Sequence, residues 1–344
     1  MISSLKGGKL PYYKVVFACT LSIVFTYMFS KNMPRKVGRE NVVATNSGDE
    51  KMNFVRLKRH RLSQPILFGD NINESSKFSN LKQELLNKIS SEKTSGKVSN
   101  VSIYLSEFND DSWMGIQQND LFDPGSIMKL PILLAYLKRL EVSPSFFDKR
   151  IKFDIVTDAM PKQTIVTNHI EKGKTYTVRN LIKAMIIDSD NQANMLLNQN
   201  IEPEYVYNVF TDLGMEVPKI QQSSVKMSAI DISKFMRVLY NSSYTTQNLS
   251  EFALELLTDT KFNNGMKKGL PDSILIAHKF GERGYRDTTF QEIHETGIIY
   301  LPNNTIVLTI MTSGNDQAYQ TQLIANITNS IYDWYEAKST PNLP

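Results

Sequence analysis

Residues 123–136 read DPGSIMKLPILLAY, in which a Pro-Gly turn leads directly into an apolar run with helical character. Ser126 and Lys129 stand three residues apart, so they share one face of the predicted helix. Their neighbours are apolar, and an apolar setting lowers the pKa of a lysine amine, which could then accept a proton from the serine hydroxyl. The pattern is equally typical of an ordinary helix start, since serine is common at helix N-termini. Both interpretations stay open on this stretch alone.

The composition is that of a globular protein with a buried core. The chain has 344 residues, of which 41% are hydrophobic, and a formal net charge of +4. So small a charge gives no reason to expect nucleic acid as a partner. The single cysteine, Cys19, excludes an intramolecular disulfide and a cysteine-based metal cluster, and the four histidines lack metal-ligand spacing. We therefore expect neither a metal nor another cofactor.

A long apolar segment lies near the N-terminus. Residues 10–30, LPYYKVVFACTLSIVFTYMFS, contain one charged residue, Lys14, and are long enough to cross a bilayer. No small-residue cleavage pattern follows, which favours an uncleaved anchor over a removed signal peptide. Basic residues flank the segment on both sides, so charge does not decide its orientation. Because long downstream domains are often translocated regardless of flanking charge, we expect a single-pass protein of the cell membrane with its folded domain outside the cytoplasm.

The remainder divides into a linker and one folded domain. After a short tail, residues 1–9, and the apolar segment, residues 31–75 are rich in basic residues, Asn, Ser and Gly without sustained periodicity. That composition predicts a flexible basic linker. Apolar side chains then recur with helical and strand spacing, so the folded domain is expected over residues 76–338.

The pattern within this domain predicts an α+β fold. A helix around residues 78–89 and an alternating strand within residues 98–108 open it. Three consecutive strands and a last helix close it, namely ILIAHKFG (274–281), TGIIYL (296–301), TIVLTIMTS (305–313) and the helix with Ile324, Ile327, Ile331 and Trp334 on one face. The patterns between these ends are mainly helical, so strands and helices segregate along the chain.

Two further motifs follow the SIMK sequence of residues 126–129. An SDN motif occupies residues 189–191 within the predicted helical stretch YTVRNLIKAMIIDSDNQANMLL, and HKFGE occupies residues 278–282 on the first of the late strands. In this order the chain resembles the penicillin-recognising serine acyl-transferases, most closely the class A β-lactamases, whose signature is SxxK, SDN and K-[ST]-G. The resemblance covers roughly residues 76–338. It implies a three-layer α/β/α fold with an antiparallel sheet, flanking terminal helices and an all-helical subdomain, as in β-lactamases and transpeptidases.

The resemblance also implies a function for individual side chains. Ser126 would be the nucleophile that attacks a carbonyl, and Lys129 its proton acceptor. Ser189 would relay a proton to the leaving nitrogen, and Lys279 would supply a positive field for a substrate carboxylate. Asn191 would hold the amide chain of the substrate, although it could equally be an ordinary helix residue.

Backbone groups complete the implied site. The N–H groups of Ser126 and Glu282 would form the oxyanion hole. Gly281 would let a ligand approach the strand closely because it has no Cβ, and a strand bulge would explain this glycine equally well.

The sequence departs from the class A pattern in two places. Phe280 stands where relatives carry Thr or Ser, so the hydroxyl that helps hold a substrate carboxylate is missing. The Glu-x-x-Leu-Asn loop, whose glutamate activates the deacylating water, is also missing. EPEYVYN at residues 202–208 comes too soon after the SDN motif and predicts a helix start at Pro203. Acylation of Ser126 is therefore expected without fast β-lactam hydrolysis.

These observations predict a membrane-anchored serine hydrolase that acts through an acyl-enzyme on an amide or ester, either a β-lactam or a cell-wall peptide. A D-alanyl-D-alanine peptidase or transpeptidase is the alternative enzyme, because it shares the nucleophile and differs in the acceptor of the acyl group. A non-catalytic wall-binding module is a third interpretation. The intact serine and lysine motifs argue against it.

Overall fold

The computed structural model describes most of the chain from Met52 onward. The described ranges are 52–59, 62–94, 96–154, 165, 168–218, 225–285 and 288–339. The predicted tail and apolar segment, residues 1–30, and the linker as far as residue 51 lie outside them. Within the described ranges, no helix combines the length and the apolar character that a membrane crossing requires.

Two strands within residues 52–71 are part of the fold, although the sequence analysis assigns them to the linker. β1 (Met52–Arg56) pairs antiparallel with β2 (Ile66–Asn71), and two side chains of β2 are buried in the core. The buried guanidinium of Arg237 forms an ion pair with Asp70 (2.6 Å) and holds this hairpin on the domain. The linker boundary therefore differs from the prediction because a contact between residues 167 positions apart orders the hairpin, and such a contact leaves no local pattern.

A five-stranded antiparallel sheet forms the centre of the domain, in the order β4-β3-β9-β8-β7. Its strands are β3 (Val98–Glu107), β4 (Trp113–Ile116), β7 (Leu275–Gly284), β8 (Gln291–Leu301) and β9 (Asn304–Gly314). The four predicted strands are confirmed, and β8 begins five residues earlier than expected. The short strand β4 was not predicted. β7 lies at the edge of the sheet, which leaves one side of this strand available to the helical part.

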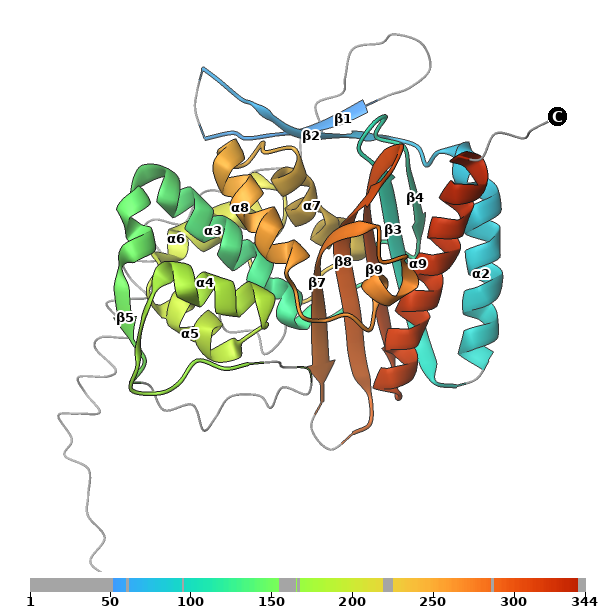
Figure 1. Cartoon of the computed structure of the whole chain (residues 1–344). Helices are drawn as coiled ribbons and strands as arrows, with labels where there is room; N and C mark the ends of the chain where they lie inside the picture. Colours follow the sequence, from blue (N-terminus) through green and yellow to red (C-terminus); the bar gives the residue numbers. More distant parts are fainter. Residues whose placement is uncertain are drawn as a thin grey trace, which may run out of the picture. The chain divides into compact units, whose positions relative to one another are not determined.

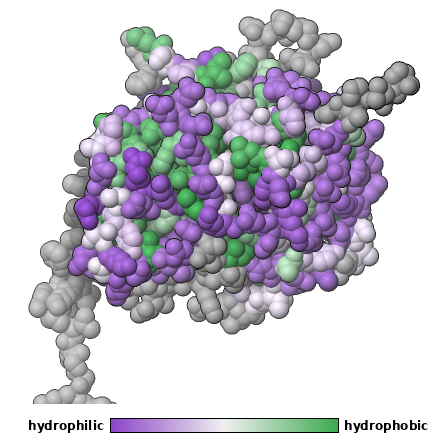
Figure 2. Space-filling view, viewed as in Figure 1, coloured by the Kyte–Doolittle hydropathy of each residue, from purple (hydrophilic) through white to green (hydrophobic). Residues whose placement is uncertain are grey.

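Helices cover both faces of the sheet. α2 (Ser79–Thr94) and α9 (Gln317–Ser339), the predicted opening and closing helices, lie side by side on one face, as Figure 1 shows. Their buried side chains form one apolar cluster with the strands, whereas the outer surface of this layer is mainly hydrophilic (Figure 2). α7 (Ala229–Tyr240) packs on the opposite face. The α+β class and its three layers are confirmed.

The all-helical part adjoins α7. Its helices are α3 (Lys129–Val142), α4 (Val178–Ile187), α5 (Asn191–Gln199), α6 (Pro203–Asp212) and α8 (Gln247–Thr258). The strand pair β5 (Arg150–Lys152) and β6 (Thr175–Thr177) and the 3-10 turn η3 (Pro144–Asp148) lie between α3 and α4. The turns η2 (Gly125–Met128) and η4 (Met266–Gly269) connect this part to the sheet, and η1 (Ser76–Phe78) directly precedes α2. α6 starts with Pro203, which confirms the predicted helix start.

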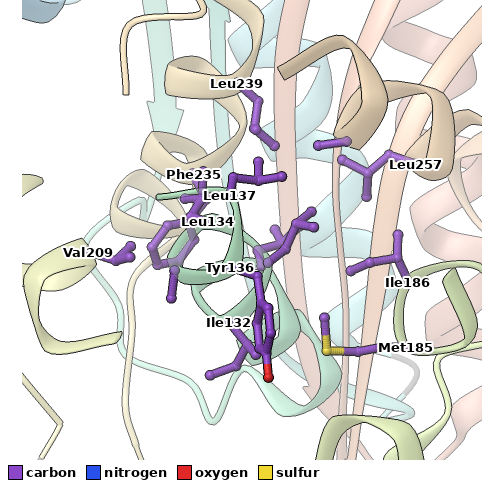
Figure 3. Packing of buried hydrophobic residues seen from close by; sticks show 14 of the residues in the cluster. Ile132, Leu134, Tyr136, Leu137, Met185, Ile186, Val209, Phe235, Leu239 and Leu257 are labelled. Carbon is purple, nitrogen blue, oxygen red and sulfur yellow. The ribbon is translucent and has the colours of Figure 1, made fainter. Parts of the chain in front are cut away.

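α3 is the central helix of this part. Figure 3 shows its side chains packed among those of the surrounding helices, with Leu134 and Tyr136 of α3 near Phe235 of α7 and Met185 of α4. The Tyr136 hydroxyl is buried too and donates a hydrogen bond to the carbonyl of Leu197 (2.8 Å). Burying α3 on nearly all sides fixes the position of its first residue, which is Lys129.

Candidate active site

Ser126 lies on the turn η2, immediately before α3. The turn begins at Gly125, which has a φ of 53° and so adopts a left-handed conformation that favours glycine. Ser126 is half-buried, and the next residue, Ile127, is fully buried and anchors the turn in the core. The predicted helix is confirmed, although it begins three residues after Ser126 because the first turn is 3-10.

Lys129 brings its amine to Ser126. Its Nζ atom lies 2.9 Å from Ser126 Oγ, 3.0 Å from Ser189 Oγ and 2.8 Å from Asn191 Oδ1, and it also donates to the carbonyl of Ser189. Only 2% of the residue is exposed. Burial lowers the pKa of this amine to about 7, although the charges of Asp190 and Glu282 act in the opposite direction. A large fraction of the lysine is therefore neutral near pH 7, and a neutral amine can accept the proton of Ser126.

Ser189 lies in a turn between α4 and α5, where the sequence analysis expected continuous helix. Its φ of 56° is uncommon for a residue other than glycine, and its side chain is fully buried. The break arises because the Asp190 carboxylate accepts a hydrogen bond from Gln192 N (2.8 Å) and so caps a new helix. Strained backbone of this kind is concentrated at functional sites.

The lysine of the third motif closes this cluster from the sheet side. Lys279 on β7 is completely buried, and its amine donates hydrogen bonds to Ser189 Oγ (2.8 Å) and to the carbonyl of Phe280 (3.3 Å). Burial and then the nearby charge of Lys129 hold the pKa of Lys279 well below its usual value. The Ser189 hydroxyl thus lies between two amines with lowered pKa values, an arrangement that can pass a proton.

Two glycines allow β7 and the nucleophile's turn to touch. A Cβ atom on Gly125 would lie 2.4 Å from the carbonyl oxygen of Glu282, and one on Gly281 would lie 2.2 Å from the carbonyl oxygen of Pro124. The backbone of Glu282 therefore borders the turn of Ser126, where a second oxyanion donor is expected. Gly281 is explained by this contact between two backbones. Neither close ligand approach nor a bulge is needed, since β7 and β8 pair without a shift in register.

The side chains of Asn191 and Glu282 contact other parts of the site. Asn191 is the first residue of α5, and its amide oxygen faces Lys129. The half-buried carboxylate of Glu282 accepts hydrogen bonds from Ile165 N (3.1 Å) and from the side-chain amide of Gln317 (3.3 Å). All the residues predicted for the site thus converge on the edge of the sheet beside α3.

Asp190 is a site residue that the sequence analysis did not single out. It is fully buried, and besides capping α5 it accepts a hydrogen bond from Ile170 N (2.7 Å) and lies 3.3 Å from His169 Nδ1. It therefore joins the turn of Ser189 to the segment that precedes β6. An aspartate directly before a helical pattern is an N-cap signal, so this function was visible in the sequence.

Phe280, which stands where relatives carry Thr or Ser, packs its ring into the core. The side chain is 3% exposed, and its ring centroid lies 4.4 Å from that of Phe262. The Lys279 amine lies 4.2 Å from the centroid of the Phe280 ring. This part of β7 therefore offers a ligand no side-chain hydroxyl.

The chain between α6 and α7, residues 213–228, contains one carboxylate residue, Glu216, which is exposed. The described end of this segment is attached to the stretch of chain that leads to Ser126, because Phe122 and Met227 exchange two backbone hydrogen bonds. In the described ranges, no group of three or more His, Cys, Asp or Glu residues is placed to hold a metal ion.

The sequence is similar to those of known enzymes. A sequence profile described as the β-lactamase enzyme family matches residues 80–335. β-Lactamase VEB-1 of Pseudomonas aeruginosa is 21% identical over 259 residues, covering 70% of this chain and 86% of VEB-1.

Solved structures share the fold. An acyl-enzyme complex of a PBP-A point mutant with penicillin G has a TM-score of 0.63 at 19% identity, covering 75% of this chain and 97% of that one. A class A β-lactamase from Mycobacterium abscessus has a TM-score of 0.60 at 18% identity, covering 73% and 98% of the two chains.

Proposed function

The chain belongs to the β-lactamase enzyme family and is a serine hydrolase, and from this premise we propose that it forms an acyl-enzyme at Ser126 with an amide or ester of a cell-wall peptide. The observation that carries the proposal is the short distance, 2.9 Å, between Ser126 Oγ and a buried lysine amine. Lys129 combines the position and the lowered pKa that a general base requires.

The proposed reaction uses the groups around Ser126 in sequence. Ser126 Oγ attacks the substrate carbonyl carbon while its proton moves to Lys129 Nζ. The N–H groups of Ser126 and Glu282 stabilise the negative charge that develops on the carbonyl oxygen. When the bond to the leaving group breaks, the Ser189 hydroxyl donates a proton to the departing nitrogen, and the neighbouring lysine amines can replace that proton.

Hydrolysis of the acyl-enzyme is proposed to be the slow step. The hydrogen-bonding groups around Lys129 are hydroxyl, carbonyl and amide oxygens, and residues 213–228 lack the Glu-x-x-Leu-Asn sequence. A β-lactam that acylates Ser126 should therefore remain attached. Phe280 removes one donor for a substrate carboxylate, and this loss affects a β-lactam and a peptide ending in a carboxylate alike.

A D-alanyl-D-alanine peptidase or transpeptidase is the second candidate. The lack of a recognisable base for water favours the transpeptidase over the peptidase, because an amine acceptor is a stronger nucleophile than water and depends less on activation. A peptide thioester ending in D-alanine, offered with and without a D-amino acid, separates the two activities. Free acid alone as product supports a hydrolase or a peptidase, a condensed product supports a transpeptidase, and products that form equally with Ser126→Ala would contradict all three.

We further propose that residues 10–30 anchor the enzyme in the cell membrane with the domain outside the cytoplasm. The support is the length and the single charge of this apolar sequence. Fractionation should recover the full chain in membranes. A truncated variant that starts at Met52 should appear in the soluble fraction. Added protease should degrade the domain in spheroplasts, and a domain protected until lysis would contradict the orientation.

A further inference from the structure

A network of buried charges lies directly behind the nucleophile. Asp123, three residues before Ser126, accepts a hydrogen bond from Gly125 N through Oδ1 (3.2 Å) and forms an ion pair with Arg283 through Oδ2 (3.2 Å). The side chain of Asp123 thus holds the turn that carries Ser126 at two points. One contact is within the turn, and the other reaches β7.

Glu292 on β8 is the centre of this network. It is 4% exposed, and its Oε2 atom accepts hydrogen bonds from Asp123 N (3.0 Å) and from the hydroxyl of Tyr285 (2.7 Å). Its Oε1 atom lies 3.6 Å from the amine of Lys226. One carboxylate therefore connects the nucleophile's turn, the end of β7 and the segment that precedes α7.

The contacts of Asp123 affect the reaction because they fix the backbone that leads to Ser126. The Ser126 N–H is an expected oxyanion donor, and its direction is set by the backbone of the three residues before it. Asp123 is fixed on both of its backbone groups, since its N–H donates to Glu292 and its carbonyl oxygen accepts a hydrogen bond from His294 Nε2 (3.0 Å). A displacement of about 1 Å at a reacting group can lower a rate about 100-fold.

We propose that Glu292 is a positioning residue for the reaction at Ser126. Its carboxylate oxygen holds the N–H of Asp123 and thereby orients the turn that supplies both the nucleophile and one oxyanion donor. This inference rests on the proposed function, because it assumes that Ser126 is acylated. The same carboxylate also holds the segment before α7 through Lys226 and the end of β7 through Tyr285.

The chain contains a matched control for this residue. Glu107 is also a buried carboxylate, 6% exposed, which accepts a hydrogen bond from a tyrosine hydroxyl, Tyr335 (2.8 Å), and pairs with an amine, Lys77 (2.9 Å). It lies on β3, away from Ser126. Glu282 borders the turn of Ser126, and the pairing of β7, β8, β9 and β3 places Val101 of β3 at the same level of the sheet. Glu107 is six residues, about 20 Å, further along β3.

The test compares methionine and glutamine variants at both positions in the detergent-solubilised full chain. Methionine has a similar size and is only a weak acceptor for the hydrogen bond from Asp123 N–H, whereas the glutamine oxygen is a good one. We expect Glu292→Met to lower the first-order acylation rate constant of a peptide thioester about 10- to 100-fold, with the dissociation constant of the thioester unchanged within about twofold. Glu292→Gln should regain most of the rate.

The control separates positioning from stability. Glu107→Met should lower the melting temperature as Glu292→Met does and acylate at the parent rate. Equal slowing by Glu107→Met, an unchanged rate in Glu292→Met, or glutamine as slow as methionine at position 292 would overturn the inference. If the parent chain itself is not acylated at Ser126 by any probe, it is the proposed function that fails.

Discussion

The Nζ atom of Lys129 lies 2.9 Å from the Oγ atom of Ser126, at a position where burial lowers the pKa of the lysine to about 7. The short distance alone would also suit a charged lysine that merely donates to the hydroxyl. The lowered pKa makes the neutral form accessible, and only that form can remove the serine proton. The pH dependence of acylation therefore distinguishes a structural lysine from a catalytic one.

Acylation of Ser126 should rise with pH around neutrality. A base with a pKa of about 7 is mostly protonated at pH 6 and mostly neutral at pH 8, so the rate constant should increase about tenfold over this interval. Stopped-flow acylation at saturating thioester measures it. Lys129→Ala should be slower by about 10²- to 10⁴-fold and should lose this pH dependence. A parent rate that is flat from pH 5 to pH 9 would remove Lys129 as the base.

Gly125→Ala should abolish acylation, because the new methyl group meets the backbone of Glu282. Gly96→Ala is the matched control, since Gly96 has a similar φ of 71° and no heavy atom within 4 Å of the added Cβ. In both variants an alanine must adopt the left-handed conformation, which lowers the free energy of unfolding by about 1 kcal/mol. Only Gly125→Ala adds the clash with Glu282. Urea unfolding and thioester acylation measure the two effects. Parent-level acylation by Gly125→Ala would contradict the close contact between β7 and η2.

Replacing Phe280 should mainly affect stability. The ring is buried against Phe262, so Phe280→Thr should lower the free energy of unfolding by about 3 kcal/mol. Phe280→Leu should lower it less, because leucine fills more of the space with apolar atoms. The added hydroxyl restores the side chain that relatives carry in this motif. A Phe280→Thr variant as stable as the parent in urea titrations would show that the ring does not fill the wall beside Lys279.

His294 should make the domain sensitive to acid. It is fully buried, its Nδ1 accepts a hydrogen bond from Thr312 N (3.2 Å), and burial lowers its pKa to about 3. Below the unfolded pKa of about 6.5 the unfolded chain binds a proton that the folded chain does not, so stability falls as the pH falls. The loss from this group at pH 5 is about 2 kcal/mol, because each pH unit contributes about 1.4 kcal/mol.

His294→Gln should remove that contribution, since its amide can replace both hydrogen bonds without titrating. The measurement is the free energy of unfolding of the parent and the variant at pH 7 and pH 5. The difference between the two proteins cancels the contributions of other carboxylates and histidines. An equal pH dependence in both proteins would show that His294 does not remain neutral in the fold.

The sequence predicts the sheet and the motifs well because local spacing carries that information. The buried strands around Ile103 and Ile310 alternate or run as continuous apolar stretches, and Ser126 and Lys129 are close in sequence as well as in space. Ser189 shows the limit of this reasoning. Apolar side chains recur at helical spacing on both sides of the polar residues 188–192, so periodicity alone does not place the break that one left-handed residue and one capping carboxylate create.

Contacts between distant residues account for what the sequence analysis misses. The hairpin at residues 52–71 is held by Arg237, and the turn of Ser126 is held by Glu292, which is 169 positions from Asp123. A charged residue on a strand ordinarily indicates a solvated face, and nothing local marks Glu292 as buried. Only the fold brings its carboxylate to an N–H that precedes the nucleophile.

The most direct test of the account is intact-protein mass spectrometry of the full chain during exposure to benzylpenicillin, with stopped-flow release from a chromogenic cephalosporin in parallel. We expect a mass increase of one penicillin located on Ser126, absent in Ser126→Ala, and a single burst of cephalosporin product followed by very slow turnover. Failure of every probe to add mass, or labelling that persists in Ser126→Ala, would contradict the assignment of the nucleophile. Rapid multiple turnover would contradict the proposal that deacylation lacks its base.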